Sequence, residues 1–193
     1  MKLLKILLIA ATVLTTGVAY AEKVTIAAAA DLKFAMDDIV ASFKKGNPSD
    51  EIEVIYGSSG KFHTQIQQGA PYDLYFSADI GFPRELAKTG FAASEVKPYA
   101  FGRIVLWSTS SDASKMTLAS LADPKITRIA IANPKHAPYG KRAVEALQAA
   151  GVWQKVEAKL VYGENIAHTV TPENTQGYFF IDMNEDAKLT DIA

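Results

Sequence analysis

The amino-acid sequence predicts an α/β fold, and three observations support this prediction. Short segments rich in β-branched and aromatic residues alternate with segments whose apolar residues recur at helical spacing, which is typical of parallel strands joined by crossover helices. The 193 residues are 49% hydrophobic, which is enough for a buried core in one domain or two small lobes. There is no cysteine, so disulfides, thiolate metal sites and a cysteine nucleophile are excluded.

The N-terminus has the features of a secretory signal peptide. Lys2 and Lys5 precede a mostly apolar run over residues 6–18, and small residues lead up to a cleavage point after Ala21. The apolar run is too short to span a bilayer as a helix of the mature protein. We therefore expect residues 1–21 to be removed on export.

The first lobe is expected over residues 22–102. We predict three strands and three helices here: strands at 24–29, 52–56 and 74–76, a helix after the first strand, a helix that ends at Gly69, and a short helix over 82–88. Asp31 is predicted to cap the first helix, and Gly90 to end the third in a left-handed conformation. The apolar face predicted for the first helix consists of Leu32, Ala35, Met36, Ile39, Val40 and Phe43.

The second lobe is expected over residues 103–193 and follows the same scheme. We predict strands at 104–107, 128–132 and 160–162, a helix over 140–150 that turns Ala143, Val144 and Leu147 inward, and the start of another helix at 164–166. From about residue 169 the pattern is atypical, although residues 178–181 are compatible with a strand. The second lobe is therefore expected to lack an obvious closing element.

The charge pattern does not favour a polyanionic partner. Lys and Arg number 20 against 21 Asp and Glu, and like charges do not form long runs. Nucleic acid and anionic membranes are bound mainly through clustered positive charge. We expect neither as a partner.

Small and polar residues follow three of the predicted strands, at 29–31, 56–61 and 137–140. In open α/β sheets, ligands bind where strands end and helix N-termini present free amides, an arrangement that suits an anion. Ser58, Ser59 and Tyr139 add uncharged hydroxyl donors. The alternative is that Gly57-Ser58-Ser59-Gly60 is an ordinary turn and helix cap. The Asp31 carboxylate would repel an anion at close range, so we expect it to point away.

An enzyme or a metal site has weaker support. Ser58 or Ser59, His63 and Asp73 are residue types of a nucleophilic triad, but the chain has no Gly-x-Ser-x-Gly elbow. The histidines lack the spacing of metal ligands, so no catalytic residue and no direct cation ligand is predicted. Four basic or imidazole side chains near the junctions are expected to be solvated: Lys61, His63, Lys135 and His136.

Several segments together resemble one family. They read VTIAAAADLKFAM, VIYGSSGKFHTQIQQGAPYDLYFSAD, GRIVLW, IAIANPKHAPYGKRAVEALQAAGVW and KLVYGEN followed by Ile166. Over roughly residues 24–167 the chain resembles the periplasmic molybdate-binding proteins of ABC importers. The resemblance implies a two-lobe periplasmic solute-binding fold that closes on its ligand about a hinge at 102–104.

The same resemblance implies a function and a site. The ligand would be molybdate or tungstate bound as an oxyanion, with no cofactor, no catalysis, an ABC importer permease as partner, a periplasmic location and a monomeric state. Many relatives have a hydroxyl where this chain has Asp31, so backbone amides are expected to act there. The oxyanion-binding residues that the resemblance implies are Ala30, Asp31, Ser58, Ser59, Tyr139 and Ile166.

The resemblance weakens at the C-terminal end. Family members continue well beyond the position of His168 and return to the first lobe, and they often supply a tyrosine to the ligand, for which Tyr178 is the candidate here. We expect an incomplete second lobe with an uncovered sheet edge and exposed apolar surface. Two alternatives stay open: a secreted serine hydrolase that uses Ser59, and a truncated family remnant that binds nothing.

Overall fold

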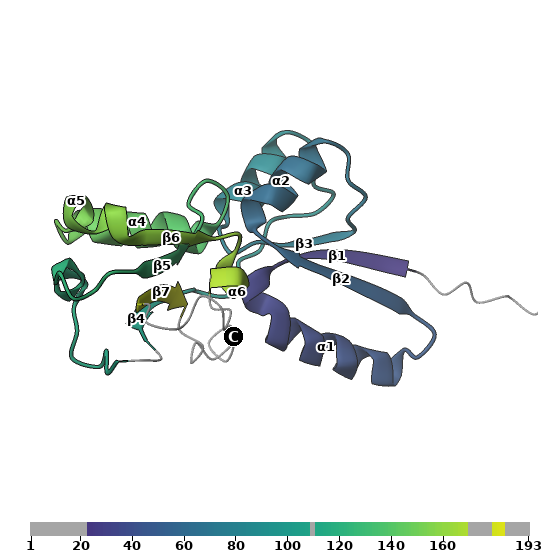
Figure 1. Ribbon diagram of the computed structural model, residues 1–193. Helices are drawn as coiled ribbons and strands as arrows, with labels where there is room; N and C mark the ends of the chain where they lie inside the picture. The colour runs from purple at the N-terminus through teal and green to yellow at the C-terminus, as the bar shows by residue number, and fades with distance from the viewer. Residues whose placement is uncertain (1–22, 109–110, 170–178, 184–193) are drawn as a thin grey trace, which may run out of the picture.

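The protein has two α/β lobes, each built on its own sheet (Figure 1). The computed structural model describes residues 23–108, 111–169 and 179–183. The predicted signal peptide and Tyr178 lie outside these residues. Within the described ranges, no helix is both long enough and apolar enough to cross a membrane. The predicted α/β class is confirmed.

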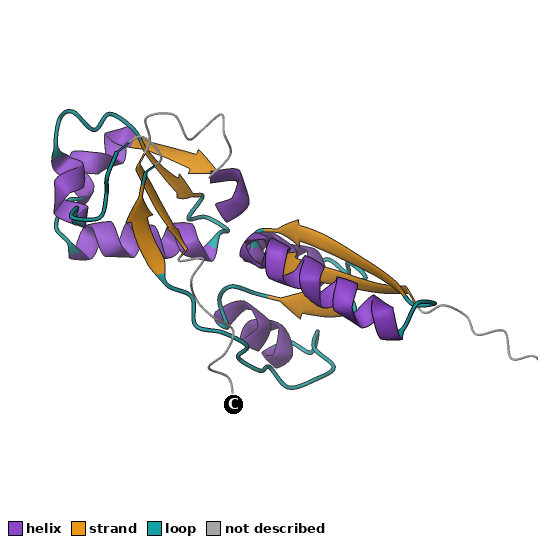
Figure 2. Cartoon of the chain, turned by 90° about the horizontal axis from the view of Figure 1, so that it is seen from below, coloured by secondary structure: helices purple, strands orange, loops and turns teal. Residues whose placement is uncertain are grey.

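The first lobe contains a parallel sheet of three strands in the order β2-β1-β3. Helix α1 lies on one face of the sheet, and α2 and α3 lie on the other (Figures 1 and 2). The elements are β1 (Lys23–Ala29), the 3₁₀ turn η1 (Ala30–Leu32), α1 (Lys33–Gly46), β2 (Glu51–Gly57), α2 (Ser59–Gln67), β3 (Leu74–Phe76) and α3 (Gly81–Lys88). Gly90 has a φ of 83°, which confirms the predicted left-handed helix end, and Gly69 after α2 has a similar φ of 88°.

The second lobe contains a sheet in the order β4-β7-β5-β6, in which only β4 runs antiparallel to its neighbour. Its strands are β4 (Ile104–Trp107), β5 (Ile129–Ala132), β6 (Leu160–Gly163) and β7 (Phe179–Met183). Its helical elements are η2 (Leu118–Ala122), α4 (Pro138–Ala149), α5 (Trp153–Val156), η3 (Glu157–Lys159) and α6 (Ile166–Thr169). Strand β7 overlaps residues 178–181, whose pattern is compatible with a strand. It lies inside the sheet rather than at its edge.

The core of the second lobe lies between its sheet and α4. Ile129 and Ile131 alternate along β5 and pack against Ala143 and Leu147, as the helical period predicts. Leu121 and Val156 extend this core, and all of these side chains have zero exposure. The described part of the second lobe therefore has a closed apolar core.

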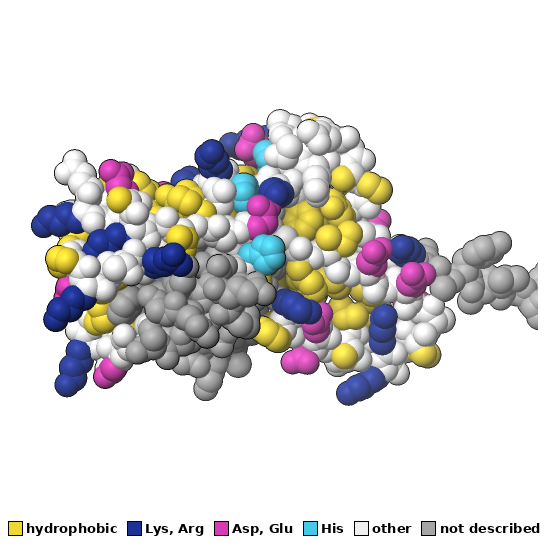
Figure 3. Space-filling model, in the orientation of Figure 1, with side chains coloured by type: hydrophobic (Ala, Val, Ile, Leu, Met, Phe, Trp, Pro, Cys, Tyr) yellow, Lys and Arg dark blue, Asp and Glu magenta, His cyan; other side chains and the backbone are white. Residues whose placement is uncertain are grey.

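The first lobe covers its apolar residues less completely. Leu32, Met36 and Val40 of the predicted α1 face pack beneath β1 and β2. Ile39 and Phe43 of the same face are exposed, so the prediction of one buried stripe is only half right. Exposed large hydrophobic side chains of the first lobe are Phe34, Ile39, Phe43, Ile55, Leu74, Phe91 and Phe101, against Tyr162 in the second. We expect exposed apolar surface in the second lobe; among the side chains that the structure describes, more of it lies in the first, where hydrophobic side chains gather in Figure 3.

Candidate functional site

Residues from both lobes enclose one large cavity. Its volume is about 1630 Å³, and its walls include η1, the loop after β3, the segment that leads into β4, and the starts of α4 and α6. Ala30, Asp31, Tyr139 and Ile166 line it, as expected of residues at one site. Ser58 and Ser59 are not among the lining residues. Both are buried, and Ser59 is bonded to Tyr75 and Ala78, which line the cavity.

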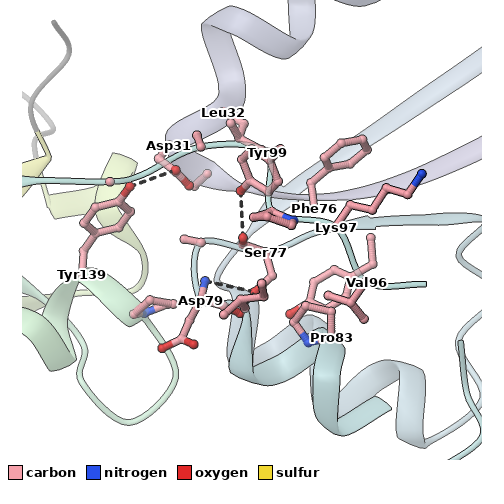
Figure 4. Close-up of a pocket in the computed structure, with 18 of the residues that line it drawn as sticks. Asp31, Leu32, Phe76, Ser77, Asp79, Pro83, Val96, Lys97, Tyr99 and Tyr139 are labelled. Atoms are coloured by element: carbon pink, nitrogen blue, oxygen red, sulfur yellow. Dashed lines mark hydrogen bonds between the residues drawn. The ribbon is translucent and has the colours of Figure 1, made fainter. Parts of the chain in front are cut away.

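The first junction differs from its prediction. A 3₁₀ turn separates β1 from α1, so the N-cap of α1 is Leu32 and not Asp31. The turn directs the Asp31 side chain across the cleft, where its Oδ2 accepts a hydrogen bond of 3.1 Å from the Tyr139 hydroxyl (Figure 4). The Oδ1 atom is buried and has no hydrogen-bond partner. Asp31 therefore does not point away from the site.

The second junction is the start of α2. Ser58 has extended backbone as the N-cap residue, but its side chain does not cap the helix. Its Oγ lies 2.9 Å from Nδ1 of His136 in the other lobe. Ser59 Oγ accepts a hydrogen bond of 3.0 Å from the Ala78 amide, which leaves the hydroxyl hydrogen for a further acceptor. The Ser59 hydroxyl can therefore donate a hydrogen bond to an anion.

The third junction connects β5 to α4. Pro138 occupies the first turn of α4, where its missing N–H costs nothing. The helix starts very close to the strand, because a Cβ added at Gly140 would lie 1.8 Å from the Ala132 carbonyl oxygen. This packing fixes Tyr139 at the mouth of the cleft, opposite Asp31 and next to Gly102.

Polar contacts join the lobes around these junctions. The Gly60 amide donates to the His136 carbonyl at 2.9 Å, and Lys61 pairs with Glu164. His136 Nε2 lies 3.9 Å from a Glu164 oxygen. These side chains form what we call the interlobe cluster, defined as Ser58, Lys61, His136 and Glu164, and histidine, lysine and acidic side chains meet at this boundary in Figure 3.

The prediction of solvated side chains is confirmed for Lys61 and Lys135, which are exposed, and is wrong for His63 and His136. His63 is buried against Phe82 and near Glu85. Lys61 and His136 both contact the opposite lobe, through partners more than 70 positions away that no local sequence signal could reveal. A second interlobe pair, Arg142 with Asp79 at 3.2 Å, was also missed for this reason.

Electrostatics differ between the two sides of the cleft. Burial raises the pKa of Asp31, and the Tyr139 hydrogen bond opposes this to a smaller degree. Burial lowers the pKa of His136, opposed by the Glu164 carboxylate. Lys61 lowers the pKa of Glu164 mainly by its hydrogen bond. A neutral acid at Asp31 is therefore favoured more than at an ordinary surface aspartate.

The side chains considered for a nucleophilic triad have separate partners. Asp73 Oδ2 accepts from the Thr25 amide at 2.7 Å, and His63 lies near Glu85. Ser59 bonds to the backbone of the β3 loop. Across the described ranges, no group of three or more His, Asp or Glu side chains could hold a metal ion.

Two α/β lobes whose strand ends and helix starts meet across a cleft define a class of proteins that enclose a small solute. Residues 24–185 match the family of bacterial extracellular solute-binding proteins, and the chain belongs to this family. This finding confirms the family resemblance and the fold that the sequence predicts.

Named relatives have been found in several bacteria. The molybdate-binding protein ModA of Azotobacter vinelandii is 34% identical over 178 residues, which are 89% of this chain and 70% of that protein. The protein of the same name from Rhodobacter capsulatus is 40% identical over 113 residues, 58% of this chain and 44% of that protein. The structure of a periplasmic molybdate-binding protein from Azotobacter vinelandii superimposes with a TM-score of 0.74 at 27% identity, covering 86% of this chain and 75% of the other.

Proposed function

We propose that this protein is a periplasmic receptor that binds molybdate or tungstate as an intact oxyanion. The observation that carries the proposal is the convergence of the junctions after β1 and β3 in the first lobe and after β5 and β6 in the second on one cleft, in a chain that is 34% identical to a molybdate-binding protein. The proposed contacts are the hydroxyls of Ser58 and Ser59 and backbone or hydroxyl donors at Ala30, Asp31, Tyr139 and Ile166.

Uncharged donors are sufficient for such a ligand. A hydrogen bond to a charged group contributes about 1.5–3 kcal/mol, so several of them together hold a dianion without a counter-charge. The N-terminus of α2 adds the positive end of its dipole. The proposed receptor therefore needs no cofactor.

The proposed mechanism is capture without chemistry. The anion stabilises the arrangement in which the lobes are closed, to the extent that it binds this arrangement better than an open one. Rotation about residues 102–104 would separate the lobes. The closed form, exported as a monomer, would present both lobes to the permease of an ABC importer.

The proposal is tested by thermal unfolding of the chain without residues 1–21. Molybdate and tungstate at a hundred times their Kd should each stabilise the fold by about 2.7 kcal/mol, whereas sulfate and phosphate should not. Transitions that are indifferent to all four anions would overturn the proposal.

A pair of serine variants tests the site. Ser59→Ala should weaken molybdate binding by about 1–3 kcal/mol, because it removes a buried donor. Ser49→Ala, at an exposed position far from the cleft, is the matched control and should bind as the wild type does. Equal affinities of the two variants would remove Ser59 from the site.

A further inference from the structure

Asp31 carries the least satisfied polar group in the cleft. Its Oδ2 accepts from Tyr139 of the opposite lobe, and its Oδ1 is buried without a hydrogen-bond partner. In the described part of the chain, the salt bridges join other residues and no cation is paired with this carboxyl. An ionised carboxylate in this position has the Tyr139 hydroxyl as its donor from the opposite lobe, besides its own backbone amide, and no counter-charge.

A neutral carboxylic acid at Asp31 instead requires a hydrogen-bond acceptor for its proton. With the proton on Oδ1, the group becomes a donor that has no acceptor among the described residues. An oxyanion between the junctions supplies only acceptors. A protonated Oδ1 and an anion oxygen would therefore satisfy each other, whereas an ionised Asp31 and a dianion would repel each other.

We propose that Asp31 is a proton-linked ligand of the bound oxyanion, so that each anion enters the cleft together with one proton held between Asp31 Oδ1 and an anion oxygen. This inference rests on the proposed function and adds a direct role for the Asp31 side chain. Burial already favours the protonated carboxyl, and the charge of the anion would favour it further. Tyr139 keeps Oδ2 as an acceptor and so directs the proton to Oδ1.

The ionisable groups around Asp31 do not compensate its charge. Tyr139 on α4 donates a hydrogen bond to it, and Tyr99 before β4 lies close enough to interact with its charge. Burial raises the pKa of Tyr99, which keeps that phenol neutral. His168 is the ionisable residue of α6, the helix that packs through Ile166 against Ala30, next to Asp31 in the chain. The other charged residues that line the cavity are Lys33, Asp73, Asp79, Glu95, Lys97, Arg103, Arg142 and Glu145.

The test is calorimetric titration of the mature chain with molybdate between pH 7 and 9, in two buffers with different ionisation enthalpies. Where the free carboxyl is ionised, wild-type binding should take up close to one proton, and its Kd should rise about tenfold per pH unit. Asp31→Asn keeps an acceptor for Tyr139 and offers an N–H donor to the anion. Its Kd should change much less with pH and be at least tenfold lower than that of the wild type at pH 9.

Each outcome decides the proposal. Proton uptake near zero in the wild type, or equal pH profiles of the wild type and Asp31→Asn, would overturn it while leaving the receptor function intact. The ratio of the two Kd values removes the contribution of His136, which is common to both proteins. If neither molybdate nor tungstate binds at any pH, the proposed function and this inference fail together. If Asp31→Asn does not fold, the wild-type proton count alone decides.

Discussion

The two lobes use similar elements but cover their apolar residues to different degrees. On β5 of the second lobe, Ile131 has zero exposure, whereas Ile39 on α1 of the first lobe is 54% exposed. The apolar period assigns Ile39 to the inner face of its helix, and Ile131 lies in a predicted apolar strand. The difference teaches that a periodic pattern predicts which face is apolar, but the presence of a packing partner decides whether that face is buried.

A matched pair of isoleucine variants gives the largest expected effect. Ile131→Ala should destabilise the protein by about 2–5 kcal/mol, because it opens a cavity in a closed core. Ile39→Ala should change the free energy of unfolding by no more than about 0.5 kcal/mol. Urea denaturation of both variants measures the difference. Equal losses would mean that α1 is covered in solution and that the contrast between the lobes is wrong.

Two glycine variants test how tightly each lobe joins its helix. Gly140→Ala would place a Cβ against the Ala132 carbonyl and should cost about 1–3 kcal/mol as α4 shifts away from β5. Gly46→Ala on α1 meets no atom within 4 Å and should stabilise by roughly 0.4–1 kcal/mol. Thermal unfolding measures both, and a neutral Gly140→Ala would show that the third junction is less rigid than its geometry indicates.

The smallest expected effect concerns the contact between the lobes. Because burial lowers the pKa of His136 in the folded protein, the unfolded state takes up the proton first as the pH falls. Stability from this group is therefore present above pH 6.5 and is lost as the pH falls below it.

The size of this loss should not exceed about 1 kcal/mol, because the ring is only partly buried and water screens much of its charge. His136→Gln lacks the titrating group, so its stability relative to the wild type should improve between pH 7.5 and 5.5. Parallel stability curves of the two proteins, measured by urea denaturation, would contradict this role.

Much of the fold followed from local patterns. The strand at 74–76 has the predicted bounds, and Gly69 and Gly90 end their helices as their left-handed conformation requires. The helix cap predicted at Asp31 was wrong, because the 3₁₀ turn that moves the cap to Leu32 depends on the packing of η1 against Tyr139 and Ile166. Spacing along the chain carries no information about such contacts.

The residues of the candidate site likewise divide into those with a local sequence signal and those whose placement depends on contacts between the lobes. The junctions that contain Ser59 and Tyr139 were predicted because small residues and hydroxyls after a strand form a local signal, and of these two residues Tyr139 lines the cavity. Lys61, His136 and Glu164 were not, since their pairing depends on how the lobes meet. The direction of the Asp31 side chain was wrong for the same physical reason.

The position of β7 has a consequence for how the chain reaches this structure. Trp107 of β4 pairs with Phe180 of β7, and the connection between them contains β5, α4 and β6. Closing a loop of this length slows folding, whereas the strands of the first lobe pair over shorter separations. During synthesis the first sheet can assemble while β4 still lacks its neighbour. The second lobe, although its core is better covered, is therefore expected to acquire protection from hydrogen exchange last.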